Sequence, residues 1–239
     1  MRITTLFFDL DGTLLPMDQD VFVEDYFGRL AKTAAAAGYD PKGCIRAVGA
    51  GVSAMVKNDG SKTNEEAFWE TFAAVMSGWK MEDRPIFDRF YRTEFQKVQA
   101  VCGCNPAAKE LVEKAKALGF RVVLATNPLF PSVATENRIR WAGFEPEDFE
   151  AYTTYEHCRY CKPNPDYYRE LLELMKLQPE ECLMVGNDLD EDMVAEKLGM
   201  KVFLLTDCLI NKSGTDLSRY PHGGFAELSR FVDALADET

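Results

Sequence analysis

The sequence predicts an α/β protein in which a doubly wound parallel sheet carries a small, all-helical insertion. Three observations support this fold class. A short apolar run near the start ends in two aspartates, the next eighty or so residues contain only helical patterns, and strands alternate with helices from about residue 104. We therefore expect a core domain formed by residues 1–15 and 99–239 and a helical domain formed by residues 16–98.

The first expected strand is Leu6–Phe8, which is apolar on both faces, as in a buried parallel strand. Asp9, Asp11, Gly12 and Thr13 follow it. Two neighbouring carboxylates at a strand end repel each other, and burying them is costly unless a cation pairs with them. The segment therefore predicts a cation site, although an Asp-Gly turn alone would produce the same pattern.

The insertion reads as four helices. Asp18 suits a helix start, Phe22, Tyr26 and Leu30 recur at four-residue spacing, and Gly38 ends the run. Further helices are expected at 41–57, across 68–76 with an end near 78, and from about 82 to 95. The polar segment 58–64 joins the second and third of them.

The rest of the chain alternates between helix and strand. Helices are expected at 106–118, at 132–141 with Ser132 as the cap, after Pro165, at 192–198 and at 225–236. Strands are expected at 121–125, 182–185 and 201–205, with a short one at 151–155.

Polar residues follow three of these strands directly. Asp9 and Asp11 follow the first, Thr126 and Asn127 follow another, and Asp188 follows a third. Ligands of open parallel sheets bind beyond the carboxyl ends of the strands, so these side chains should meet at one mouth. Each residue taken alone could also be an ordinary turn or helix cap.

Together these motifs resemble the haloacid dehalogenase (HAD) superfamily of hydrolases. The motifs are Asp9-Leu10-Asp11-Gly12-Thr13, Thr126-Asn127, Lys162-Pro163-Asn164-Pro165, and Gly186-Asn187-Asp188 with Asp192 four residues after Asp188. The resemblance implies a HAD-like Rossmannoid core, and the helical insertion after the first motif matches the members with a helical cap.

The resemblance also implies residue roles. Asp9 would be the nucleophile that forms an aspartyl-phosphate, and Asp11 would be the general acid and base. Thr126, Asn127 and Lys162 would bind the phosphate.

The cofactor implied by the same resemblance is Mg²⁺. It would be bound by Asp9, the backbone carbonyl of Asp11 and Asp188, while Asp192 would hold a metal-bound water or Lys162. The additional acids at 190 and 191 leave open whether Asp190 or Asp192 matters more, although the spacing favours Asp192.

The expected activity is phosphatase action on a small phosphorylated metabolite. A phosphomutase and a non-catalytic phosphate-binding module are the alternatives. A dehalogenase is disfavoured because Asp11 supplies a proton that an ester oxygen needs and a halide does not.

No motif identifies the substrate. Lys62, in the polar segment 58–64, is a candidate for substrate specificity in the cap, and an exposed turn is the ordinary explanation of that segment.

Composition excludes several other classes. The formal net charge of -12 argues against a nucleic-acid partner, and no apolar run is long enough to span a bilayer. No signal peptide is apparent, and seven scattered cysteines favour a reducing, cytoplasmic location. Cys102, Cys104, Cys158 and Cys161 could form a zinc site, with unlinked thiols as the alternative. The oligomeric state is left open.

Overall fold

The computed structural model describes residues 2–237. Its sheet contains five parallel strands in the order β2-β1-β3-β4-β5. The strands are β1 (Thr5–Phe8), β2 (Arg121–Leu124), β3 (Cys182–Gly186), β4 (Lys201–Leu205) and β5 (His222–Gly223). The α/β fold class is therefore confirmed. The sequence did not predict β5, because two residues are too few to produce a strand pattern.

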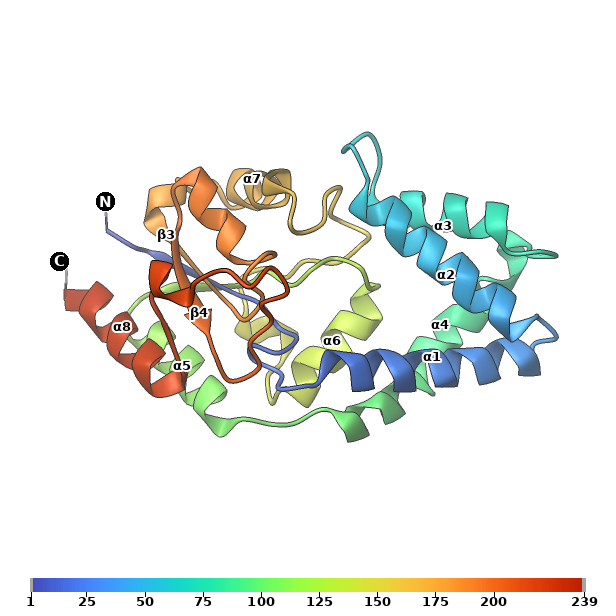
Figure 1. Ribbon diagram of the computed structural model, residues 1–239, viewed down its shortest axis with the longest axis horizontal. Helices are drawn as coiled ribbons and strands as arrows, with labels where there is room; N and C mark the ends of the chain where they lie inside the picture. The colour runs from blue at the N-terminus through green and yellow to red at the C-terminus, as the bar shows by residue number, and fades with distance from the viewer. Residues whose placement is uncertain (1, 238–239) are drawn as a thin grey trace.

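Helices cover both faces of this sheet, as Figure 1 shows. The helices of the core are α5 (Pro106–Ala117), α6 (Ser132–Trp141), α7 (Pro165–Met175) and α8 (Phe225–Asp237). Leu6 and Phe8 pack into the cluster that includes α5 and α8, whereas Phe7 packs into the cluster that includes α7. Successive side chains of β1 thus point to opposite, equally buried faces, as a central parallel strand requires.

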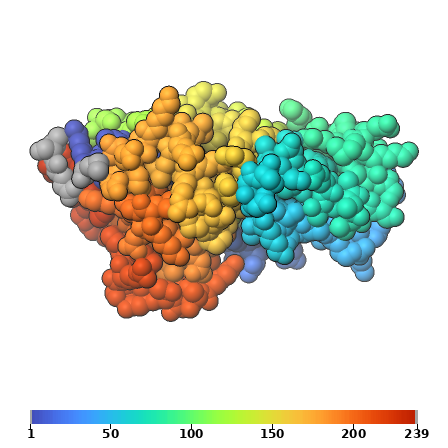
Figure 2. All heavy atoms as spheres, turned by 90° about the horizontal axis from the view of Figure 1, so that it is seen from above, coloured from blue at the N-terminus to red at the C-terminus, as the bar shows by residue number. Residues whose placement is uncertain are grey.

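The insertion forms a separate lobe beside the core, the cap, which is seen as the blue and cyan mass in Figure 2. Its helices are α1 (Gln19–Ala36), α2 (Pro41–Val56), α3 (Asn64–Val75) and α4 (Pro85–Arg92). Side chains cap three of them: Asp18 caps α1, Asp40 caps α2, and Thr63 forms a capping box with Glu66 at α3.

The two chain segments that join the cap to the core lie side by side. Met17 and Cys102 form an antiparallel bridge, and the backbone N–H of Gly103 donates to the carbonyl of Pro16 at 2.7 Å. The insertion therefore leaves the core and returns to it at one place.

Four local predictions were wrong. The fourth cap helix ends at Arg92, and Phe95 lies in a separate 3₁₀ segment, η2 (Phe95–Val101). Residues 151–155 make only a single bridge, between Tyr152 and Leu124. Ser132 does not cap α6 but is its first residue, since Pro131 occupies the N-cap position and the Glu156 carboxylate accepts the Ser132 N–H. The helix after Asp192 is a 3₁₀ segment, η5 (Met193–Leu198).

The remaining 3₁₀ segments are short turns of the connections. They are η1 (Met81–Asp83), η3 (Pro146–Asp148), η4 (Pro179–Glu181) and η6 (Leu217–Arg219). Within the described residues, no helix has the length and apolar character needed to cross a membrane.

Candidate active site

Lys162 joins two aspartates at the carboxyl end of the sheet. Asp9 follows β1 directly, and its N–H donates to the carbonyl of Val185 in β3 at 2.9 Å. The Lys162 ammonium lies 2.9 Å from Asp9 Oδ1 and 2.6 Å from Asp192 Oδ1, and all three side chains are buried. One buried cation thus compensates two carboxylates that the sequence separates widely.

Asp192 is held by the backbone as well as by Lys162. Its Oδ2 accepts the N–H of Asp188 at 3.0 Å, so both of its oxygens have protein donors. A Cβ on Gly186 would lie 2.0 Å from that oxygen, so only glycine fits there. Asp190 is exposed. Of the two acids that the sequence left open, Asp192 is therefore the one that contacts Lys162.

Burial dominates the electrostatics of this triad. It raises the pKa of Asp192 to about 8, with Lys162 opposing the shift and Asp9 adding to it. Burial alone would lower the pKa of Lys162, but Asp192 and Asp9 outweigh it and hold the pKa well above its usual range. Lys162 therefore stays positively charged beside the proposed nucleophile.

The turn after β1 is fixed by a side chain from the end of β3. Thr13 Oγ1 donates to Asn187 Oδ1 at 2.8 Å and lies 3.4 Å from Asp9 Oδ2, while Asn187 Nδ2 donates to the carbonyl of Cys208. Gly12 has a φ of +82°, and a Cβ there would lie 2.3 Å from Asn187 Nδ2. The turn therefore requires glycine for its conformation and for the close approach of Asn187.

Asp11 is paired with a residue that the sequence did not indicate. Arg138, on α6, is completely buried, forms an ion pair with Asp11, and stacks its guanidinium 4.4 Å from the centre of the Phe130 ring. Asp11 Oδ1 is buried and has no hydrogen-bond partner among the described residues. Burial raises the pKa of Asp11, and Arg138 opposes that shift. Nothing in the pattern of α6 distinguishes Arg138 from the exposed Arg140 nearby.

Two residues from the other strand-end motifs meet across the mouth. Asn127 Nδ2 donates to Glu191 Oε2 at 3.0 Å, and Asn127 Oδ1 is buried without a partner in the described chain. Burial raises the pKa of Glu191 to about 7, with Asp188 and Asp9 adding to the shift and Lys162 opposing it. Thr126 is buried at the end of β2, beside β1. From the sequence, Glu191 was noted only as an additional acid between Asp188 and Asp192, without a role.

The donors at this mouth fit a hard cation such as Mg²⁺. The expected ligands are all oxygen atoms, from the carboxylates of Asp9 and Asp188 and the backbone carbonyl of Asp11, and Mg²⁺ commonly takes one or two carboxylates together with waters and substrate phosphate. Within residues 2–237, no three acidic, histidine or cysteine side chains converge as a metal cluster. Asp188 lies at the end of β3, and its Oδ1 accepts the N–H groups of Asp190 and Glu191.

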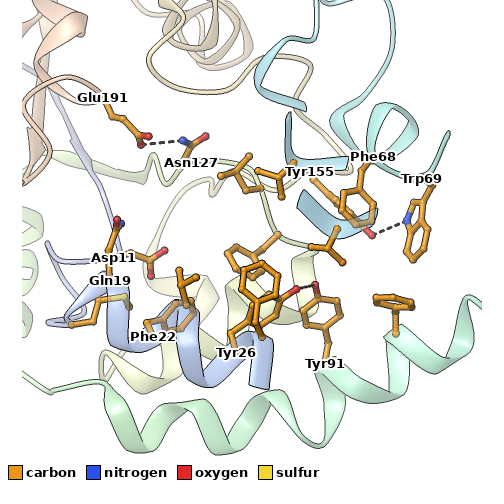
Figure 3. A pocket seen from close by; sticks show the side chains of 18 residues that line it. Asp11, Gln19, Phe22, Tyr26, Phe68, Trp69, Tyr91, Asn127, Tyr155 and Glu191 are labelled. Atoms are coloured by element: carbon orange, nitrogen blue, oxygen red, sulfur yellow. Dashed lines mark hydrogen bonds between the residues drawn. The ribbon is translucent and has the colours of Figure 1, made fainter. Parts of the chain in front are cut away.

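A cavity of about 280 Å³ leads from this mouth into the cap. Asp11, Asn127 and Glu191 line one end of it, and Figure 3 shows the aromatic side chains that line the rest. They include Phe22, Tyr26, Phe68, Trp69, Tyr91 and Tyr155. Because α1, α3 and α4 of the cap supply five of these six rings, cap and core build the cavity together.

The polar segment 58–64 contacts the core, but Lys62 does not line the cavity. Lys62 pairs with Glu70 at 2.5 Å on the surface. Asn64 reaches the core. It is completely buried, its N–H donates to the carbonyl of Cys158, and its Nδ2 lies 3.3 Å from the carbonyl of Tyr160.

The cysteines are free thiols. Cys158 and Cys161 are buried, and burial raises the pKa of Cys158 to about 12. Cys161 Sγ accepts from Asn64 Nδ2 at 3.3 Å. Raised pKa values disfavour the thiolate form that zinc requires.

The chain belongs to the family of haloacid dehalogenase-like hydrolases, whose family model matches residues 3–199. This span contains the four motifs and the helical insertion, so the resemblance noted in the sequence is confirmed. The chain is an enzyme, a hydrolase of the phosphatase type within this family.

Relatives and solved structures agree with this assignment. The chain is 23% identical over 202 residues to pyrophosphatase PpaX of Bacillus cereus, covering 84% of this chain and 82% of the relative. A predicted phosphoglycolate phosphatase from Haemophilus somnus has a TM-score of 0.59 at 16% identity, covering 97% and 98% of the two chains. β-Phosphoglucomutase of Clostridium difficile has a TM-score of 0.57 at 15% identity, covering 99% and 98%. These structural likenesses establish the fold.

Proposed function

We propose that the enzyme is a Mg²⁺-dependent phosphatase that hydrolyses a small phosphorylated metabolite through an aspartyl-phosphate on Asp9. The observation that supports this most directly is the buried contact of 2.9 Å between Lys162 and Asp9. Asp11 stands beside it with an unpartnered oxygen. A positioned carboxylate, a fixed positive charge and an acid of raised pKa are the groups that phosphoryl transfer to a side chain requires.

In the first step, Asp9 would attack the phosphorus atom. A bond forms between a carboxylate oxygen and phosphorus, the bond from phosphorus to the leaving oxygen breaks, and Asp11 gives that oxygen its proton. Lys162 offsets negative charge at the site. Burial raises the pKa of Asp11, which favours the protonated form that this step needs.

In the second step, a water molecule would attack the phosphorus atom and give its proton to Asp11. The bond between Asp9 and phosphorus breaks, inorganic phosphate leaves, and both aspartates return to their starting forms. Thr126 and Asn127 are the proposed donors to the phosphoryl oxygens. Asn127 now donates to Glu191, so it would exchange that partner for the substrate.

Bound Mg²⁺ would supply positive charge to the phosphoryl oxygens. We assign Asp9, the backbone carbonyl of Asp11 and Asp188 as its ligands. Asp192 would act through Lys162 or a metal-bound water, since protein donors occupy both of its oxygens.

Replacing Asp9 by asparagine tests the covalent step. Asp9→Asn should fold normally and lose several powers of ten in kcat, because the nucleophile is gone. Asp190→Asn, the same change at an exposed acid of the same mouth, should keep near-normal activity. Retained phosphate release by a clean Asp9→Asn preparation would refute the mechanism.

A phosphomutase of the same fold is the second candidate, since β-phosphoglucomutase of Clostridium difficile shares the architecture. The aromatic cavity argues against it for a sugar phosphate, because few of the lining side chains are polar. Free phosphate released in step with substrate consumption would distinguish the two. A phosphate-binding module without catalysis would require Asp9 and Asp11 to serve no chemical role.

The proposal also covers the cellular location of the enzyme and its partners. We propose a cytoplasmic location, on the basis of seven scattered cysteines. We propose no nucleic-acid partner, on the basis of the net charge of -12.

A further inference from the structure

We propose that the substrate is a phosphate monoester whose leaving group carries an uncharged, apolar group of about the size of an aromatic ring. This inference rests on the proposed phosphatase function and concerns the part of the substrate that is not phosphate. It follows from the size, the polarity and the charge of the cavity between cap and core.

The cavity begins at the carboxylate Asp11 and ends in the cap beside Trp69 (Figure 3). Its volume is about 280 Å³. An apolar protein cavity of about 150 Å³ is enough to bind benzene. With its phosphate at Asp9, an ester would therefore have room in the cavity for one aromatic ring and a short linker.

Four aromatic side chains of the wall direct their polar atoms toward one another. The hydroxyl groups of Tyr26 and Tyr91 are hydrogen-bonded to each other at 3.0 Å, and Trp69 Nε1 donates to Tyr155 Oη at 3.2 Å (Figure 3). These four side chains therefore present mainly ring surface to a ligand. A hydroxylated leaving group packed against the faces of these rings would lose hydrogen bonds to water that the ring faces cannot replace, whereas an apolar one would not.

The charge of the lining excludes a second anionic group. No lysine, arginine or histidine lines the cavity in the described part of the chain, whereas Asp11 and Glu191 do. Two guanidinium groups next to lining residues already have partners. Arg138 pairs with Asp11 and stacks on Phe130, and Arg84 pairs with Glu65 while lying 5.1 Å from the Trp69 ring.

This arrangement differs from what the names of the relatives suggest. Phosphoglycolate and pyrophosphate, the substrates in those names, each carry a second anionic group next to the reacting phosphate. In this cavity such a group would lie near Asp11 and Glu191, and no cationic side chain lines the cavity in the described residues to pair with it, which costs free energy.

Four substrates of the purified enzyme with Mg²⁺ test the inference: 2-phenylethyl phosphate, ethyl phosphate, phosphoglycolate and pyrophosphate. The leaving groups of the first two are simple alcohols, which differ only in the phenyl ring. Burying the ring should raise kcat/KM for 2-phenylethyl phosphate roughly 10- to 100-fold over ethyl phosphate, and phosphoglycolate should be poorer still. Equal or better use of phosphoglycolate or pyrophosphate would overturn the inference and leave the phosphatase function standing.

If the enzyme hydrolyses none of the four, the proposed function fails, and binding decides the inference. The probes are then the non-hydrolysable phosphonates with a 3-phenylpropyl or a propyl group, measured by calorimetry. At least tenfold tighter binding of the phenylpropyl compound is expected. Equal affinity for the two phosphonates would refute an apolar subsite.

Two pairs of matched variants locate the subsite. Val52 on α2 lines the cavity, whereas Val56 on the same helix is exposed outside it. Val52→Phe should lower the ratio of kcat/KM for 2-phenylethyl phosphate to kcat/KM for ethyl phosphate at least tenfold. Val56→Phe should leave this ratio unchanged.

The second pair uses exposed positions, where a larger side chain is tolerated better than at the partly buried Val52. Val23 and Val21 on α1 are 44% and 45% exposed, and only Val23 lines the cavity. Val23→Phe should alter the preference and Val21→Phe should not. An unchanged preference in both Val52→Phe and Val23→Phe would overturn the proposal.

Discussion

Arg138 and Asp11 are 127 residues apart in the sequence and form a buried ion pair at the mouth of the cavity. Arg138 has no exposed side-chain surface, while Asp11 keeps 19% of its own. A buried cation that loses its partner, or a buried carboxylate that loses its cation, is strongly destabilising. The pair therefore links the stability of the core to the position of the proposed general acid.

We predict that Arg138→Met lowers the free energy of unfolding by about 3–5 kcal/mol, because Asp11, whose side chain is mostly buried, is left without its cation. The double variant Arg138→Met with Asp11→Asn should regain much of this loss while remaining inactive. Urea unfolding of the four proteins in this cycle measures both effects. Arg140→Met, on the exposed side of the same helix, should change stability by less than about 1 kcal/mol. Additive losses in the double variant would show that the pair is not coupled.

Asp188 is predicted to bind Mg²⁺. Asp188→Ala should therefore need at least tenfold more Mg²⁺ for half-maximal activity, and raised Mg²⁺ should restore part of the rate. The measurement is phosphate release against Mg²⁺ concentration, with EDTA as the zero point. An Asp188→Ala enzyme with the Mg²⁺ dependence of the wild type would place the metal elsewhere.

Gly186 is predicted to be irreplaceable although its φ lies outside the left-handed region. A Cβ there would lie 2.0 Å from Asp192 Oδ2 and force that carboxylate away from Lys162. Gly186→Ala should lower kcat about 100-fold, as expected when a charged group moves by about 1 Å. Gly49→Ala is the control, because its Cβ would meet nothing and α2 should gain about 0.5–1 kcal/mol. A fully active Gly186→Ala enzyme would show that the Asp192 position is unimportant.

Asn64 is predicted to hold the cap against the core. It is completely buried and bonds to the segment just before Lys162, so Asn64→Ala should cost about 1–3 kcal/mol of stability and raise KM. Unchanged unfolding and KM values would refute this role.

Lys62→Ala, two residues away, is the matched surface change and should affect stability by less than about 1 kcal/mol. The same variant tests whether Lys62 influences specificity. Its relative rates on the four substrates would change if it does and stay constant if its contact with Glu70 is its only role.

The sequence predicted the parts of this molecule that depend on local pattern. Apolar strands followed by polar residues predicted which segments meet, because all strands of a parallel sheet present their carboxyl ends at one edge. Asp9, Lys162 and Asp192 do meet there. Arg138 was missed, and Asn187 and Asn64 were noted only as members of a motif and of the polar segment 58–64. Their importance lies in contacts across the fold that leave no periodic signal in the chain.

The cavity was missed for a related reason. In the sequence, Phe22, Tyr26 and Leu30 recur at four-residue spacing in the insertion, and this spacing is also that of an ordinary helical core. The space between the rings arises from the packing of α1 against α4 and Phe130 and of α3 against Tyr155. Rings that fill a core and rings that surround a void have the same spacing along a helix.

The bridge between Met17 and Cys102, and the contact from Gly103 to Pro16, make the cap an insertion whose entry and exit coincide. A segment with adjacent ends can be lengthened, exchanged or removed while the strands on either side keep their register. In evolutionary terms, one reaction centre could then acquire a new leaving-group preference by replacing a single continuous stretch of gene. The sheet and its charged mouth would be inherited unchanged, and only the lining would be under selection for a new compound.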